Sequence, residues 1–80
     1  MKEQLEAIRK AALDSIAGTQ AAADLEALRV KYLGKKGELT AVLKQMGKLS
    51  PEERPVMGQM ANEVRAALEE AIERQSAVLA

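Results

Sequence analysis

Apolar residues recur every three or four positions along most of this 80-residue chain. That spacing is typical of amphipathic α-helices. The pattern predicts four helices, at about 2–17, 20–33, 38–46 and 51–80. The positions expected to face a common core are Leu5, Ile8, Ala12, Leu13, Ile16, Leu25, Leu28, Tyr32, Leu39, Val42, Leu43, Met46, Met57, Met60, Ala61, Val64, Leu68, Ala71, Ile72 and Leu79. The predicted fold class is therefore all-α.

Glycine and proline mark where these helices are expected to begin and end. Gly18 is expected to end the first helix as a left-handed C′ residue, with Thr19 capping the second helix. Ser50 is the expected cap of the fourth helix, with Pro51 at its first helical position and glutamates behind it. Pro55 predicts a distorted or 3₁₀ start to that helix, because its ring crowds the carbonyl four residues earlier.

The lengths of the segments predict how they pack. A helix over 51–80 spans about 45 Å at about 1.5 Å per residue, which matches the stretch 20–46. The short connection 47–50 makes these two stretches antiparallel, so we expect a coiled-coil-like helical hairpin. Its 20–46 arm is expected to be interrupted near Gly34–Gly37. The first helix is expected to pack at the open end of the hairpin. Residues 29–32 alternate in polarity and would also suit a strand, but no second strand-like segment could pair with them.

Composition excludes several kinds of function. The chain has no Cys, hence no disulfide, thiolate metal site or thiol nucleophile, and this fits a reducing cytosol. It also has no His, the usual general base and commonest metal ligand near neutral pH. No apolar stretch approaches the roughly 18 residues that span a bilayer. The segment Gly34–Gly37 lacks the spacing and the Ser/Thr of a phosphate-binding P-loop. The chain itself is therefore expected to have no catalytic site, no metal and no cofactor.

The charges are balanced overall but segregated along the chain. Twelve basic residues match twelve acidic ones, yet the stretch 29–48 contains only one acid, Glu38. Such a local basic surface is typical of a protein whose partner carries phosphate. From spacing alone, a nucleic-acid surface and an ordinary solvated helix face remain equal alternatives. The basic residues of this stretch are Arg29, Lys31, Lys35, Lys36, Lys44 and Lys48.

The single aromatic residue, Tyr32, narrows the class of nucleic acid. Single-stranded bases are usually bound on several stacked aromatic rings, which this chain cannot provide. The expected target is therefore a folded RNA or a duplex backbone, recognised by shape and by phosphate position.

The same stretch also carries a family resemblance. The run Arg29-Val-Lys-Tyr-Leu-Gly-Lys-Lys-Gly37, within residues 25–40, and the segments 46–55 and 58–64 resemble the N-terminal domain of the bacterial phenylalanyl-tRNA synthetase alpha subunit. In that family this region is a coiled-coil arm ahead of a class II catalytic domain, and it reaches the outer, elbow side of tRNA(Phe). The resemblance implies that the six basic residues Arg29, Lys31, Lys35, Lys36, Lys44 and Lys48 contact the tRNA backbone.

The resemblance also implies a larger context for the chain. It points to a fragment or excised domain, ending at Ala80 without a helix cap, of a cytoplasmic ligase of protein biosynthesis. That ligase would use ATP and Mg²⁺ and assemble with a beta subunit as an α2β2 heterotetramer. The alternative is a structural helical hairpin that mediates protein–protein assembly through the apolar stripe of Leu39, Val42 and Leu43.

Overall fold

A computed structural model describes residues 2–79, and it confirms an all-α chain. The elements in order are α1 (Lys2–Ala17), α2 (Ala22–Leu33), α3 (Glu38–Gln45), the short 3₁₀-helix η1 (Met46–Lys48) and α4 (Glu53–Leu79). No strand occurs among these residues, so residues 29–32 are helical rather than extended. The predicted bounds differ from the observed ones by two residues at most. The predicted end of the fourth helix at Ala80 lies outside the described residues.

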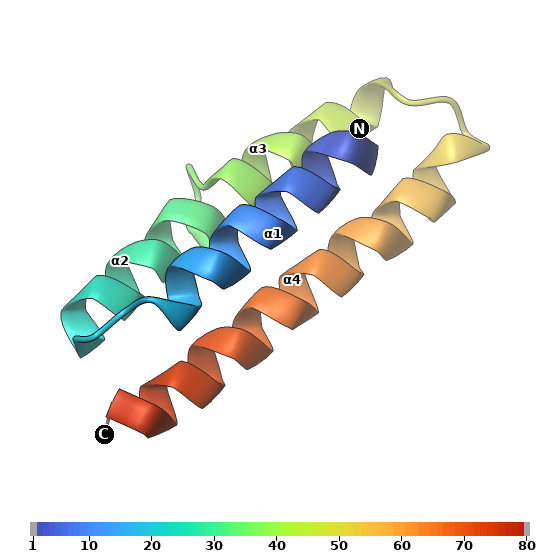
Figure 1. Ribbon diagram of the computed structural model, residues 1–80. Helices are drawn as coiled ribbons and strands as arrows, with labels where there is room; N and C mark the ends of the chain where they lie inside the picture. Colours follow the sequence, from blue (N-terminus) through green and yellow to red (C-terminus); the bar gives the residue numbers. More distant parts are fainter. Residues whose placement is uncertain (1, 80) are drawn as a thin grey trace.

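The helices form a thin rod (Figure 1). Helices α2 and α3 follow one another along one arm, and α4 runs antiparallel to them as the other arm, as expected for a helical hairpin. The rod measures 43 × 19 × 15 Å. The predicted place of the first helix is wrong. Instead of packing at the open end, α1 lies along the hairpin and contacts α2, α3 and α4, most extensively α4.

The position of α1 follows from its apolar stripe. Leu5, Ala12 and Ile16 are all buried, and they are spread over about 16 Å of helix at 1.5 Å per residue. A stripe of that length has to be covered along its whole extent. Ala61, a small residue of α4, is fully buried as well. The α1–α4 contact therefore completes a bundle of three packed segments, which are α1, the α2–α3 arm and α4.

The predicted core is confirmed. Every apolar position assigned to it is buried or half-buried, and none is exposed. The largest fully buried side chains are Leu5, Leu39 and Leu68, one each from α1, α3 and α4. No polar side chain is buried among the described residues. The fold is held by one continuous apolar cluster that all four α-helices share.

The end of α1 differs from the prediction, since no glycine of the described chain has a positive φ. The Gly18 amide instead donates to the carbonyls of both Asp14 and Ser15, each at 3.2 Å. The Thr19 hydroxyl donates to the Ile16 carbonyl at 2.7 Å. A tightened last turn and a side-chain hydroxyl therefore satisfy the orphan carbonyls that a left-handed glycine would otherwise cover.

The predicted cap of α2 is also wrong, because the Thr19 side chain bonds to the end of α1 instead. The Thr19 hydroxyl is committed to α1, and α2 begins after Ala21, which makes no side-chain capping bond. The Thr19 carbonyl accepts a hydrogen bond at 2.9 Å from the side-chain amide of Gln75, on α4. This turn is therefore fixed by a contact between residues 56 positions apart.

The start of α4 agrees in part. The Glu53 amide donates to the Ser50 hydroxyl at 3.4 Å and to the Ser50 carbonyl at 3.1 Å, so the expected Ser cap and a 3₁₀-type bond are both present. Pro51 lies in the preceding turn rather than at the first helical position. From Glu53 onward α4 is α-helical through Pro55, so the expected distortion is confined to the first turn. A proline so close to the helix start has no intrahelical hydrogen bond to lose.

Candidate nucleic-acid interface

The basic stretch contains a tight turn that separates α2 from α3, and the turn is a full break rather than a kink. The Gly37 amide donates to the Gly34 carbonyl at 2.8 Å, which closes the turn around Lys35 and Lys36. The Thr40 hydroxyl donates to the same Gly34 carbonyl at 2.7 Å. Both ends of the turn are thus hydrogen-bonded to their own neighbours, and the two lysines at its tip are exposed.

Gly34 and Gly37 serve close backbone packing rather than ligand contact. Glycines that flank a basic turn can let backbone amides approach a ligand closely. In the structure the Gly34 amide donates to the Val30 carbonyl at 3.0 Å, and a Cβ added at Gly34 would lie 2.5 Å from that oxygen. Both glycine amides are therefore used inside the chain. A ligand at this turn would therefore not be bound by these two glycine amides.

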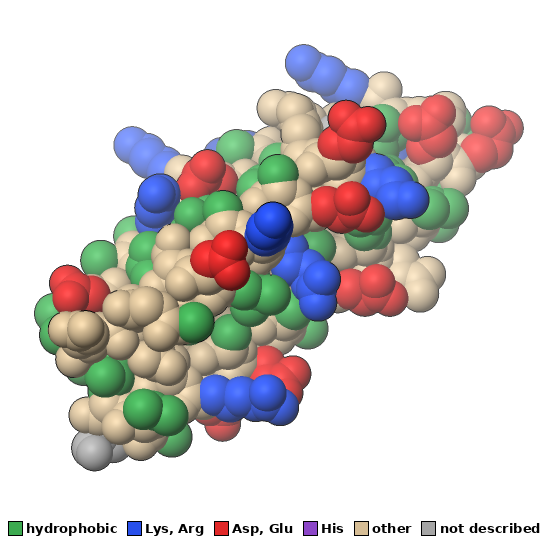
Figure 2. Space-filling view, in the orientation of Figure 1, with side chains coloured by type: hydrophobic (Ala, Val, Ile, Leu, Met, Phe, Trp, Pro, Cys, Tyr) green, Lys and Arg blue, Asp and Glu red, His purple; other side chains and the backbone are tan. Residues whose placement is uncertain are grey.

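The lysines of the stretch remain available to a partner. Lys35, Lys36, Lys44 and Lys48 are exposed, and no ion pair in residues 2–79 involves them. On α3, Lys44 lies about 140° around the helix from buried Leu39, so it faces outward. Figure 2 shows Lys and Arg side chains projecting from the outer edge of the α2–α3 arm.

The two basic residues of α2 lie on different flanks of that helix. Arg29 and Lys31 are two positions apart, which is about 200° around the axis. Lys31 places its ammonium 5.3 Å from the centre of the Tyr32 ring, within the range of a cation–π contact. The six predicted residues therefore do not form one flat patch. The other four basic residues lie on the turn, α3 and η1, whereas Arg29 and Lys31 lie on two different flanks of α2.

Arg29 is paired within its own helix. Its guanidinium donates from Nε and Nη2 to the Glu26 carboxylate at 2.9–3.2 Å, with both side chains more than half exposed. The hydrogen bond from Arg29 lowers the pKa of Glu26. The same bond raises the pKa of Arg29, and the charge of Glu69 on α4 adds a smaller contribution. Arg29 thus faces α4.

Arg65 is a basic residue that the sequence did not single out, because it lies on the acidic arm. In the structure it borders two hollows between the arms, and both hollows also contain Leu33. One hollow, of about 290 Å³, has Lys35 on its opposite wall, and the other contains Arg29. The sequence signal that could have identified Arg65 is its i,i+4 spacing from Glu69. In the structure these two residues form an ion pair at 3.0 Å that aligns the Arg65 side chain.

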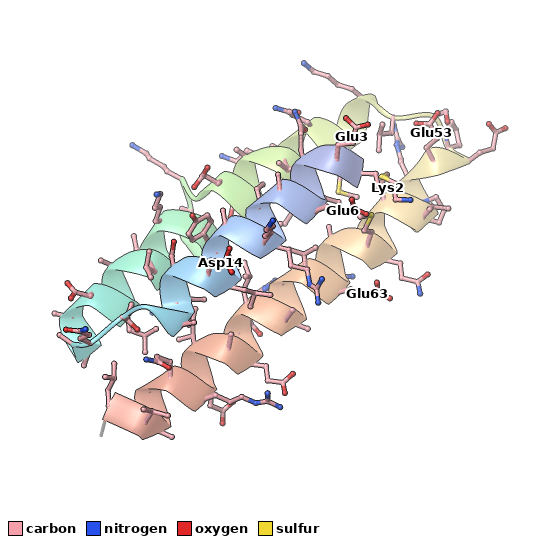
Figure 3. The ribbon with its side chains drawn as sticks, in the orientation of Figure 1. Lys2, Glu3, Glu6, Asp14, Glu53 and Glu63 are labelled. Carbon is pink, nitrogen blue, oxygen red and sulfur yellow. The ribbon has the colours of Figure 1, made fainter. Side chains whose placement is uncertain are left out.

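Acidic residues are concentrated on the other elements. Glu3, Glu6 and Asp14 project from α1, and Glu53 and Glu63 project from α4 (Figure 3). None of them forms an ion pair with the basic stretch within residues 2–79. The exposed lysines of the basic stretch thus have no acidic partner within residues 2–79, whereas Arg29 is paired with Glu26 and faces Glu69.

Other kinds of site find little support in the described part of the chain. Residues 2–79 contain no group of three acidic side chains placed to hold a metal ion. Within the same residues, no helix combines the length and the apolar character needed to cross a bilayer.

Comparison with known proteins identifies the family. The family described as aminoacyl tRNA synthetase class II, N-terminal domain, matches residues 20–80. These residues include both arms of the hairpin and the basic turn. The chain therefore belongs to the class II aminoacyl-tRNA synthetase N-terminal domain family.

The similar curated proteins are more specific. The phenylalanine–tRNA ligase alpha subunit of Acetivibrio thermocellus is 63% identical over 73 residues, covering 91% of this chain and 22% of that protein. Those of Clostridium novyi (57% over 74 residues; 92% and 22%) and Halalkalibacterium halodurans (56% over 79 residues; 99% and 23%) are similar too. The resemblance seen in the sequence is confirmed. The chain spans less than a quarter of the length of these relatives, and no solved structure matches it significantly.

Proposed function

We propose that this chain is a tRNA-binding arm that contacts the backbone of tRNA(Phe) during aminoacylation by a phenylalanine–tRNA ligase. The main support is the exposed pair Lys35 and Lys36, held on a hydrogen-bonded turn and without an ion pair to any residue of 2–79. Because the turn is already ordered, binding costs less conformational entropy there than on a flexible loop. The names of the relatives supply the RNA and the reaction.

The proposal also assigns the remaining parts of the enzyme to other segments. In the longer ligase, a class II catalytic domain would bind ATP and Mg²⁺, and a beta subunit would complete an α2β2 heterotetramer in the cytoplasm. This arm would contribute no reacting group. Its contribution would be to orient the tRNA through phosphate contacts that do not depend on base sequence.

The proposal can be tested by removing the two lysines of the turn together. We expect Lys35→Gln/Lys36→Gln to weaken binding of a tRNA(Phe) transcript at low salt by about tenfold or more. The slope of log affinity against log salt should fall by at least about 1. A matched control is Lys2→Gln/Lys10→Gln on α1, which removes the same charge and should change affinity by less than about twofold. Equal effects of both double variants, or binding that ignores salt, would contradict the proposal.

The alternative of an assembly hairpin has less support. Leu39 and Val42, which it would use for association, are 1% and 6% exposed because they pack in the chain's own core. An assembly contact would have to use other side chains. Sedimentation over a range of concentrations separates the two proposals, since an assembly module forms concentration-dependent oligomers and a tRNA-binding arm does not require them.

A further inference from the structure

The side of the hairpin where α3 faces α4 carries a groove whose charge comes from both arms. Lys35 lies on one wall and Arg65 on the other, and Leu33, Leu39 and Leu43 lie between them. The adjoining hollow contains Arg29, which is paired with Glu26, and becomes acidic farther along α4 at Glu69 and Glu73. An anionic group is therefore favoured at the Lys35 end of the groove and repelled at the Glu73 end.

Arg65 is oriented but not saturated by its partner. Only its Nε donates to the Glu69 carboxylate, at 3.0 Å. Its two Nη nitrogens make no hydrogen bond to any described residue. A guanidinium held in this way offers its outer edge as a two-pronged donor, which is the geometry that phosphate oxygens accept.

Lys35 is the complementary donor on the opposite wall. Its backbone position is fixed by the bonds from Gly37 and Thr40 to the Gly34 carbonyl. No described acid pairs with its ammonium. The leucines that line the groove give it an apolar surface. A charge-assisted hydrogen bond is stronger beside such a surface than in open solvent.

We propose that Arg65 and Lys35 together bind one phosphate of the RNA backbone in the groove between α3 and α4. This inference rests on the proposed function and adds to it a binding residue on the arm opposite the basic stretch. It makes the site a property of the folded hairpin, because the two cations are 30 positions apart in the sequence. A fluctuation that separated the arms would separate the two donors.

The decisive experiment compares arginines on the same helix. We expect Arg65→Gln to weaken binding of a tRNA(Phe) transcript at low salt by about five- to tenfold. Arg65→Lys, which keeps the charge, should recover at least half of that loss. The control is Arg74→Gln: Arg74 forms the same kind of i,i+4 ion pair, with Glu70, but borders a different hollow. Thermal melts of all three variants should differ little, since exposed ion pairs contribute about 0–1 kcal/mol to stability.

Sharing of one phosphate is tested by combining the variants. If Lys35 and Arg65 hold the same phosphate, losing either donor releases it. The affinity of Lys35→Gln/Arg65→Gln for the transcript should then be at most about twofold lower than that of the single variant that binds less tightly. Losses that multiply would show two separate contacts and overturn the proposal. So would equal effects of Arg65→Gln and Arg74→Gln.

The outcomes also distinguish this inference from the proposed function. If Lys35→Gln/Lys36→Gln weakens binding but Arg65→Gln does not, the groove site is wrong and the tRNA-binding arm stands. If the unaltered chain fails to bind the transcript at low salt, or neither variant has an effect, both proposals fail.

Discussion

Gly37 lies directly against the backbone of Tyr32. A Cβ placed on Gly37 would be 2.6 Å from both the carbonyl carbon and the carbonyl oxygen of Tyr32. Gly37 has a φ of −69°, so the absence of a side chain, and not an unusual backbone conformation, is what this position requires. The contact lets the chain fold back on the last turn of α2 before α3 begins.

Gly37→Ala is therefore expected to destabilise the fold. Because the clash involves backbone atoms that cannot rotate away, we expect a loss of about 1–3 kcal/mol, seen as a drop of roughly 4–8 °C in Tm per kcal/mol. Gly47→Ala is the control, since nothing lies within 4 Å of a Cβ at that position. Its Tm should stay the same or rise slightly. Equal Tm values for the two variants would show that the turn relaxes freely.

The hydrogen bond from Gln75 to the Thr19 carbonyl predicts a link between distant parts of the chain. Gln75→Met keeps the length of the side chain and removes the donor, so we expect a loss of about 0.5–1.5 kcal/mol in urea unfolding. Amide hydrogen exchange should also become faster in the α1–α2 turn. Gln59→Met, an exposed position on the same helix, should change neither measurement.

Truncating the buried Leu68 side chain measures how much of the stability of the fold resides in the core. Its side chain is fully buried, so Leu68→Ala should cost about 2–5 kcal/mol. A domain of this size has only about 3–5 kcal/mol in total, and the helical circular dichroism signal at 25 °C should drop markedly. Val78→Ala, at a position 74% exposed, should stay within about 0.5 kcal/mol of the unaltered chain. A Leu68→Ala variant as stable to unfolding as the unaltered chain would mean that the core is not shared as described.

The Glu26–Arg29 pair predicts a pH dependence with a definite sign. Arg29 lowers the pKa of Glu26 in the folded state below its ordinary value of 4.5. The pair therefore stabilises the fold above the unfolded pKa, and this contribution is lost as the pH falls through the lowered folded value. In an NMR titration the Glu26 carboxyl should have its midpoint below 4.5, and Arg29→Gln should move that midpoint upward. High salt should reduce the difference, because both side chains are exposed.

Much of the fold could be predicted because it depends on local periodicity. The 3.6-residue repeat placed Leu25 and Tyr32 on one face and Leu39 and Val42 on another, and all four are buried. A helix stripe of this kind is read from neighbouring residues, so no long-range information is needed. The basic stretch could also be identified from neighbouring residues, because residues 29–48 contain six basic side chains and one acid.

Most of the parts that failed depend on contacts between distant residues, although the Thr19 cap failed because of a local bond. Thr19 has the chemistry of an N-cap, but its hydroxyl bonds Ile16, and its carbonyl position is fixed by Gln75. The place of α1 depends on which of several apolar faces it covers, which periodicity cannot rank. Arg65 was missed because its rotation toward Lys35 depends on how α4 packs against α3.

The location of the turn along the rod determines how a long ligand could approach. Lys35 faces Arg65, and Arg65 lies near the midpoint of α4. A double helix bound there would lie against the side of the rod, across its long axis, rather than against one tip. On a 43 Å body, the tip of the hairpin, where Lys48 lies, is then a second point of contact that only a ligand extending along the rod could reach as well.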